Sequence, residues 1–480
     1  MKDTAKGVRP CAGRVPAFWC ALLCTGVLLA ASGCRTNPVT GGTDLMLISP
    51  EQELGMGDGY HPSIIFMYDG EYLDADLKRY LGAIAMRLHA NTHRPGMRTD
   101  FTLVNSSVVN AFAIPGHVYA TRGFVSGIEN EAQFAAVMAH ELGHVAAGHT
   151  ARQMTRQTLM SLGLGVTGTA LGEGGRSALV LGQAGAALLN LSYSREMEHQ
   201  ADRVGTYYMA LSGWDPREAL SMQRLLSRLA GRKETVLDKY LSTHPPTNER
   251  LAEIRSVIDE KQLLTSGLIQ GDGIYAGRWN RRMAAVRAVN EAFEPYDRGS
   301  KELAGRDYDE ALRAAEQAIG MRADQAPFHR LRGDALLGLD RLAGAEAAYW
   351  QALRIDRRHV PANIGLGQVA YERDEFAEAE RQFASAAHGF PASALAQYGL
   401  GLSRYSQQKY AESIPPLENA AEAAPSDPDL LYVLAECYDR TGKRAEAYRA
   451  YIAALNAGLT GDRRRRALQR ARVLQPVAAP

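Results

Sequence analysis

The sequence predicts two folds in one chain: an α+β domain, mostly helical with a small sheet, followed by an all-α solenoid of helical repeats. Two observations predict them. Helical and strand patterns mix from residue 46 to about residue 270. A regular period, marked by Gly299, Gly333, Gly367 and Gly401, then governs small and large apolar positions across residues 292–461.

Length and composition suit a protein of several globular parts. The 480 residues are 46 % hydrophobic and 22 % charged, and the formal net charge is +1. Nothing in that balance indicates nucleic acid as a partner, because phosphate binding needs a clustered basic surface. We interpret the basic run Arg463–Arg466 as a solvated helix face. Four of the five cysteines lie at or before Cys34, so no disulfide framework or cysteine-based metal site is expected.

Residues 1–33 are typical of a secretory signal peptide. Basic residues precede the apolar stretch Phe18–Ala31, which is short for a membrane span. The end of this stretch, Ala31-Ser32-Gly33-Cys34, resembles a bacterial lipobox, which implies that Cys34 is lipidated and begins the mature chain. Arg35 in the next position implies sorting to the outer membrane. The alternative is an ordinary signal peptide with Cys34 incidental. Residues 34–45 are expected to form a polar tether.

Residues 46–270 carry the mixed pattern of helices and strands. Phe101–Val104 and His117–Thr121 are predicted strands, and Asn110–Gly116 between them contains a Pro-Gly turn. Asn130 to about Leu159 is predicted to be one helix, because the segment contains few breakers.

The predicted helix contains His140-Glu141-Leu142-Gly143-His144, the HExxH arrangement of metallopeptidases. Histidines four residues apart on a helix share one face, so both imidazoles can meet one metal ion. Glu141 lies beside them and can reach a water molecule at the metal. A chance pair of core or surface histidines is the alternative. Catalytic zinc takes three protein ligands, so a third ligand is expected downstream.

Three motifs resemble the CAAX-prenyl-protease and HtpX-like gluzincin family: HELGH at 140–144, SRxxExxAD at 194–202, and Thr243-His244-Pro245. The resemblance implies that Glu198 is the third zinc ligand. It also implies that Asp202 lies behind the ligands and orients a zinc histidine. Glu196 and His199 point away from Glu198 on a helix and are expected to be solvated or packed.

Other residues near these motifs leave alternatives open. In the repeat-bearing branch of the family, the histidine equivalent to His244 can displace the zinc water and hold the enzyme inactive. The alternative for His244 is a loop histidine bonded to backbone. His149 lies off the ligand face of a continuous helix and is not expected to bind the metal. The oxyanion donor is not assigned, and Tyr193 is one candidate.

Two further segments bear on how substrate would reach the site. Asn110–Arg122 resembles the family's edge strand, to which an extended substrate adds as a further strand. His117 in this segment could touch substrate or simply be exposed. The apolar segment Leu162–Leu191 has halves too short to span a bilayer. A mobile amphipathic hairpin over the site, or at a membrane surface, is expected there.

Residues 292–461 are predicted to form five helical repeats, which resemble tetratricopeptide repeats. Small side chains at the helix crossings let two helices pack closely, while a large side chain fills the gap to the next repeat. A generic helical bundle is the alternative. Residues 271–291 are expected to be a connecting helix, and 462–480 a basic capping helix and tail. The periodic positions include Gly299, Gly333, Gly367 and Gly401, and also Tyr349, Phe383, Leu417 and Tyr451.

Together these features favour a zinc-dependent metalloendopeptidase with one Zn²⁺ per chain, held by His140, His144 and Glu198, with Glu141 as the base. The lipobox implies a lipid-anchored protein of the outer membrane that faces the periplasm, and the family resemblance implies that it degrades misassembled envelope proteins presented by its repeats. The alternative function is an outer-membrane protein assembly factor or chaperone in which the repeats dominate. An integral membrane protease would need several spanning helices.

Overall fold

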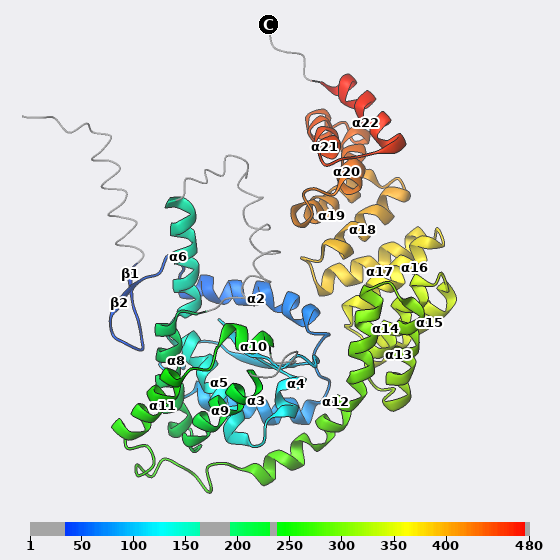
Figure 1. Cartoon of the computed structure of the whole chain (residues 1–480). Helices are drawn as coiled ribbons and strands as arrows, with labels where there is room; N and C mark the ends of the chain where they lie inside the picture. Colours follow the sequence, from blue (N-terminus) through cyan, green and yellow to red (C-terminus); the bar gives the residue numbers. More distant parts are fainter. Residues whose placement is uncertain (1–33, 164–192, 231–237, 476–480) are drawn as a thin grey trace, which may run out of the picture.

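The computed structural model describes residues 34–163, 193–230 and 238–475. Figure 1 shows an α+β domain built around a small sheet, followed by a stack of paired helices. This arrangement confirms the predicted fold class. The predicted signal peptide and nearly all of the apolar segment 162–191 lie outside the described residues. Within the described ranges, no helix combines the length and apolarity that a bilayer crossing requires.

The sheet of the first domain has three strands in the order β3–β5–β4. Strand β3 (Asp100–Val104) is parallel to β5 (His117–Thr121), and β4 (Ala111–Ile114) is antiparallel to β5. The two predicted strands are therefore confirmed. Strand β4 lies within Asn110–Arg122, the segment that resembles the family's edge strand, and it is an edge of the sheet. The turn itself follows at Gly116, whose φ of +86° favours glycine.

The expected polar tether is instead a short hairpin, so that prediction was wrong. Strands β1 (Cys34–Thr36) and β2 (Thr43–Leu45) pair antiparallel. The Asn37 side chain closes their turn by accepting hydrogen bonds from the backbone of Val39 and Thr40. Arg35 forms an ion pair of 2.9 Å with the buried carboxylate of Glu53, which fixes the hairpin to the domain.

Helix α5 (Glu131–Ala146) is buried along its whole length at the centre of the domain. Asn130 caps its N-terminus by accepting a hydrogen bond from the Gln133 backbone. The helices around it cover both the sheet and α5. They are α2 (Pro50–Met67), α3 (Ala75–His89), α4 (Arg122–Gly127), α6 (His149–Gly163), α8 (Arg195–Leu211), α9 (Arg217–Ala230), α10 (Asp238–Thr243) and α11 (Asn248–Glu260).

The segment from Asn130 to Leu159, predicted as one helix, is two helices. Helix α5 ends at Ala146, and Gly148 takes a φ of +67° before α6 begins at His149. A glycine in the left-handed region is a common helix terminator. The break turns the chain so that the start of α6 lies against the end of α5.

Helices α5 and α8 approach closely because each offers a glycine to the other. A Cβ on Gly143 would lie 3.0 Å from the Val204 side chain, and a Cβ on Gly205 would lie 2.9 Å from the His140 backbone nitrogen. This close contact sets α8 directly against the helix that carries the HExxH motif.

Five helix pairs form the repeat stack, and α22 (Gly461–Leu474) covers its end (Figure 1). The Tyr349 ring fits between Gly333 and Gly365, where a Cβ on either glycine would clash with it. The predicted packing of a large side chain on small ones is thus confirmed. The remaining helices are α12 (Ala276–Ala304), α13 (Tyr308–Met321), α14 (Ala326–Gly338), α15 (Leu342–Ile355), α16 (Val360–Glu372), α17 (Phe376–Gly389), α18 (Ala394–Ser406), α19 (Tyr410–Ala423), α20 (Pro428–Arg440) and α21 (Arg444–Asn456).

Helix α12 joins the two folds. It begins at Ala276, inside the range 271–291 expected to be a connecting helix, and continues into the first repeat. The repeats also contact the first domain directly: the rings of Phe66 and Phe390 lie 5.1 Å apart, and Arg358 lies 3.7 Å from Glu71. The first domain and the repeat stack therefore pack against each other.

Candidate metal centre

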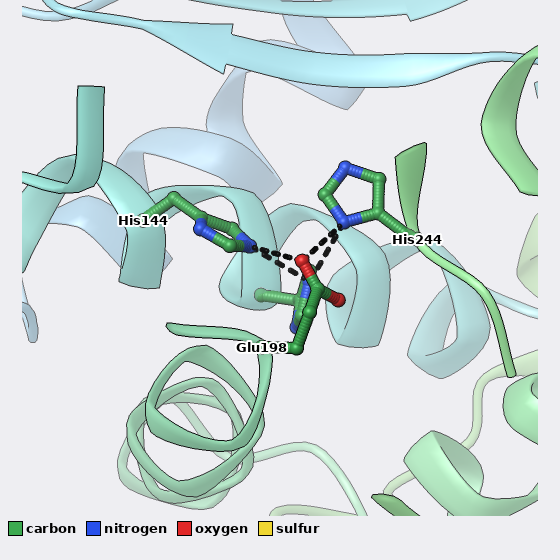
Figure 2. Close-up of side chains that lie close together, drawn as sticks. His144, Glu198 and His244 are labelled. Atoms are coloured by element: carbon green, nitrogen blue, oxygen red, sulfur yellow. Dashed lines mark hydrogen bonds and ion pairs between the residues drawn. The ribbon is translucent and has the colours of Figure 1, made fainter. Parts of the chain in front are cut away.

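Four buried side chains, from two helices and from the residue that follows a third, converge beneath the sheet. His140 and His144 come from α5, Glu198 from α8, and His244 follows α10. One ligand atom from each lies within 4.8 Å of the others. Figure 2 shows His144 and His244 pointing toward Glu198 from opposite sides. The structure thus brings together the two HExxH histidines, the predicted third ligand and the histidine of the THP motif.

The spacing of the donor atoms fits one metal ion. His140 Nε2 lies 3.1 Å from His144 Nε2 and 3.4 Å from His244 Nδ1. Glu198 Oε1 lies 3.3 Å from His144 Nε2 and 2.9 Å from His244 Nδ1. Tetrahedral ligands at zinc–nitrogen bond lengths would be about 3.3 Å apart. Three imidazoles and one carboxylate are also a donor set that suits zinc.

Glu141 lies beside this cluster without joining it. Its Oε1 atom is buried, accepts no hydrogen bond from the described residues, and lies 3.6 Å from His244 Nε2. Burial raises the pKa of the Glu141 carboxyl. A buried carboxylate oxygen left free beside a ligand cluster suits a base that receives a proton from water.

The ligand residues differ in protonation because their surroundings differ. Burial would raise the pKa of Glu198, but His244, His140 and His144 hold it well below the ordinary value. Burial lowers the pKa of His144. Burial also acts to lower the pKa of His140, but Asp202 and Glu198 outweigh it and raise the value to about 9. A metal ion bound here would therefore displace a proton from His140 Nε2.

Asp202 lies behind His140, and Arg250 holds Asp202 in place. His140 Nδ1 lies 2.9 Å from Asp202 Oδ1, which leaves Nε2 facing the cluster. Arg250 donates to both Asp202 oxygens, at 2.6 and 2.8 Å, and its Nη1 lies 3.0 Å from Glu198 Oε2. It also donates to the backbone oxygen of Pro245. Arg250 thus connects the two buried carboxylates of α8, Glu198 and Asp202, to the His244 loop.

Arg250 was not predicted, because nothing in the local sequence distinguishes it. It occupies the third position of α11, and the exposure of such a residue depends on what packs over the helix. Burial opposes its charge, yet Asp202 and Glu198 raise the pKa of Arg250 above its ordinary value. The guanidinium therefore stays charged and neutralises part of the buried negative charge.

The remaining candidates take other positions. Tyr193 stacks its ring on His144 with 4.0 Å between centroids, and its hydroxyl lies 3.2 Å from Thr150 Oγ1. Glu196 is exposed, and His199 lies 3.8 Å from Glu253, so neither joins the cluster. The side chain of Cys34 lies outside the description.

His117 is not exposed, so that alternative was wrong. Its strand, β5, is the central one, and its Nε2 lies 2.9 Å from Asp58 Oδ1. The His117 ring stacks on His61. It is buried because β4, not β5, forms the edge of the sheet.

Comparison with known proteins decides the family of the first domain. Residues 75–258 match the model of peptidase family M48, and that range includes every residue of the cluster. The chain carries an M48 peptidase domain. Residues 296–359, 364–428 and 402–458 match the tetratricopeptide repeat model, so tetratricopeptide repeats follow the M48 domain.

Several curated proteins are similar to this chain. The beta-barrel assembly-enhancing protease of Yersinia pestis is 31 % identical over 259 residues, which cover 49 % of this chain and 51 % of that protein. The protein of the same name from Escherichia coli strain K12 is 30 % identical over 238 residues, 47 % and 48 % of the two chains. Mitochondrial metalloendopeptidase OMA1 of Arabidopsis thaliana is 33 % identical over 162 residues, 34 % and 32 %. The matches thus span about half of these relatives or less.

A solved structure also resembles part of the chain. The crystal structure of YrrB, titled a TPR protein with an unusual peptide-binding site, is 15 % identical with a TM-score of 0.33. That match covers 38 % of this chain and 98 % of YrrB.

Proposed function

We propose that this chain is a zinc-dependent metalloendopeptidase whose M48 domain binds one Zn²⁺ through His140, His144 and Glu198. The observation that carries the proposal is the convergence of these three side chains, all buried, with Glu141 directly beside them. Three protein ligands plus one further coordination position is the arrangement of catalytic zinc sites.

The residues around the ligands have different roles in peptide-bond hydrolysis. When bound, zinc supplies a Lewis acid that polarises the scissile carbonyl and acidifies water. Glu141 takes a proton from the attacking water and passes it to the leaving amine. Asp202 orients His140 through the 2.9 Å contact at Nδ1, and Arg250 keeps Asp202 and Glu198 in register.

His244 acts as a latch in this proposal. Its Nδ1 lies 2.9 Å from Glu198 Oε1 and 3.4 Å from His140 Nε2, at the fourth corner of the donor set. Water and substrate need that same position. We infer that His244 holds the site closed at rest and must withdraw, with its Pro245-Pro246 loop, before cleavage.

The names of the relatives and the presence of the repeats support a cellular location and a class of substrate for this chain. The printed name of the bacterial relatives, beta-barrel assembly-enhancing protease, supports work on outer-membrane proteins in the cell envelope. We propose that the repeats present misfolded or misassembled envelope proteins, and that an extended segment adds to the free edge of β4. We also propose that Cys34 carries a lipid anchor in the outer membrane, with the domain facing the periplasm.

Cleavage of an unfolded protein by purified variants tests the peptidase proposal. Removing a general base costs about 10²- to 10⁴-fold in rate, so Glu141→Gln should lose at least about 100-fold while still binding zinc. Glu196→Gln is the matched control, because Glu196 is an exposed carboxylate on α8 outside the cluster. A Glu141→Gln protein that cleaves as fast as wild type would exclude this mechanism.

The second candidate function is an assembly factor or chaperone in which proteolysis is secondary. Its support is the position of His244, whose Nδ1 lies 3.4 Å from His140 Nε2, together with the stack of paired helices. Under this alternative, the Glu141→Gln variant restores envelope integrity in a deletion strain as well as wild type. The peptidase proposal expects it to fail.

A further inference from the structure

We propose that His149 and Gln200 form a hydrogen-bond relay that fixes the tautomer of His144 and presents its Nε2 lone pair to the metal. This inference rests on the proposed zinc site, since it concerns how that site holds one ligand. It makes His149 a positioning residue, a role that neither the HExxH motif nor the spacing along a continuous helix indicates.

The helix break at Gly148 places His149 where a continuous helix would not. Gly148 ends α5 with a left-handed backbone conformation, and His149, the first residue of α6, lies against the last turn of α5. His149 Nδ1 lies 2.8 Å from His144 Nδ1, and the two rings meet at 70°. The His149 side chain is 0 % exposed, so water does not compete for this contact.

The relay ends on α8, the helix that supplies Glu198. His149 Nε2 lies 2.9 Å from Gln200 Oε1. Gln200 Nε2 is buried and bonds to none of the described residues, which agrees with an amide that serves the relay only through its oxygen. Three side chains from α5, α6 and α8 are thus linked in one line.

The order of donors and acceptors along this line follows from elementary chemistry. A carbonyl oxygen only accepts, so His149 Nε2 carries the hydrogen that Gln200 receives. A neutral imidazole has one N–H, so His149 Nδ1 is the acceptor and His144 Nδ1 donates to it. His144 then has no hydrogen on Nε2, the atom that faces His140 and Glu198.

The two zinc histidines would therefore be oriented by different means. His140 donates to the Asp202 carboxylate, whose charge Arg250 balances. His144 donates to a neutral imidazole, and its ring is stacked on Tyr193. A neutral acceptor adds no second buried charge near Glu198. A metal-bound histidine usually donates its other ring N–H to one hydrogen-bond acceptor.

Zinc affinity, measured by competition with a chromophoric chelator on the full chain, tests the relay. Loss of a partner behind a metal ligand costs about 10- to 100-fold in metal affinity, so His149→Leu should weaken zinc binding by that factor. His149→Asn keeps an acceptor near the Nδ1 position and should stay within about threefold of wild type. His329→Leu is the matched control, since this histidine in the repeats is likewise buried but bonds to the Ala323 backbone, away from the cluster.

Gln200 gives a second test that avoids the buried ring. Gln200→Met removes the acceptor for His149 Nε2 and should weaken zinc binding about tenfold. Thermal melting of the metal-free proteins shows whether each variant folds. Equal zinc affinity of His149→Leu and wild type, or of Gln200→Met and wild type, would overturn the relay. So would equal losses for His149→Leu and His149→Asn in folded proteins. A wild-type chain that binds no zinc would instead overturn the proposed function.

Discussion

Arg250 is the guanidinium that balances the buried negative charge around the site. It faces two buried carboxylates, Asp202 and Glu198, each less than 5 % exposed. Removing one partner of a buried ion pair leaves the others uncompensated, which costs about 3–5 kcal/mol. Arg250→Met should therefore lower the free energy of unfolding by about that amount, measured by denaturant titration of the metal-free protein. Arg79→Met is the control, because its exposed pair with Asp76 is worth less than about 1 kcal/mol. Equal losses for the two variants would contradict this account.

The His244 latch makes a separate prediction. If His244 occupies the fourth position at rest, His244→Ala should raise kcat/KM on an unfolded protein, by about tenfold for a closed state favoured by about 1.4 kcal/mol. Steady-state kinetics of wild type and variant measure this. An inactive but folded and zinc-loaded His244→Ala protein would show that His244 takes part in catalysis instead.

At this scale the sequence predicted the residues that a motif marks and missed those that only packing selects. His140, Glu141 and His144 follow from the spacing in HExxH, and Glu198 and Asp202 from the family resemblance. Arg250 and His149 depend on how α11 and α6 fold back onto the site, and no local pattern reports that.

At the scale of elements, the close contact of α5 and α8 sets the ligand geometry. Gly205→Ala would place a methyl group 2.9 Å from the His140 backbone nitrogen. Such overpacking costs about 1–3 kcal/mol and should displace α8, and Glu198 with it. We expect a lower melting temperature and weaker zinc binding. Gly320→Ala is the control: it lies in helix α13 with nothing within 4 Å of its Cβ, and should change stability by at most about 1 kcal/mol.

Helix α16 predicts a pH effect in the repeats. His359 caps this helix by accepting a hydrogen bond from the Ala362 backbone, as Ser393 does for α18 at the corresponding position of the next repeat. Burial, with a contribution from Arg330, lowers the pKa of His359 to about 3. The unfolded pKa is about 6.5, so the stabilisation present above that value is lost as the pH falls from about 6.5 toward 3.

His359→Ser keeps a cap and removes this titration. Between pH 7 and pH 5 the wild type should lose about 2 kcal/mol more than the variant, measured by denaturant titration at both values. His388→Ser, at an exposed position of α17, should behave as wild type. Parallel pH profiles for wild type and His359→Ser would show that His359 does not carry the effect.

Helices were predicted correctly where a sequence period marks them. The predictions were wrong where a single residue ends a helix or closes a turn. The repeat period placed the paired helices, because large side chains pack on small residues at regular intervals, as Phe383 does on Gly367 and Gly399. A single glycine split the helix at position 148, and a single asparagine side chain closed the hairpin expected as a tether. Helix propensity summed over a window predicts neither the helix break nor the hairpin turn.

At the scale of the whole molecule, the M48 domain and the repeats form one assembly through α12 and the contacts of Phe66 with Phe390 and of Arg358 with Glu71. The sequence predicted both parts but not this contact, because residues so far apart along the chain leave no joint pattern. The arrangement suits a protein in which the repeats receive a substrate and the metal centre cuts it.

The most direct test of the central claim is cleavage of an unfolded protein by the wild-type chain before and after removal of metal. We predict that the metal-free protein stays folded, loses at least about 99 % of its activity, and recovers it when one equivalent of Zn²⁺ per chain is added. Undiminished cleavage by folded, metal-free protein would contradict the claim.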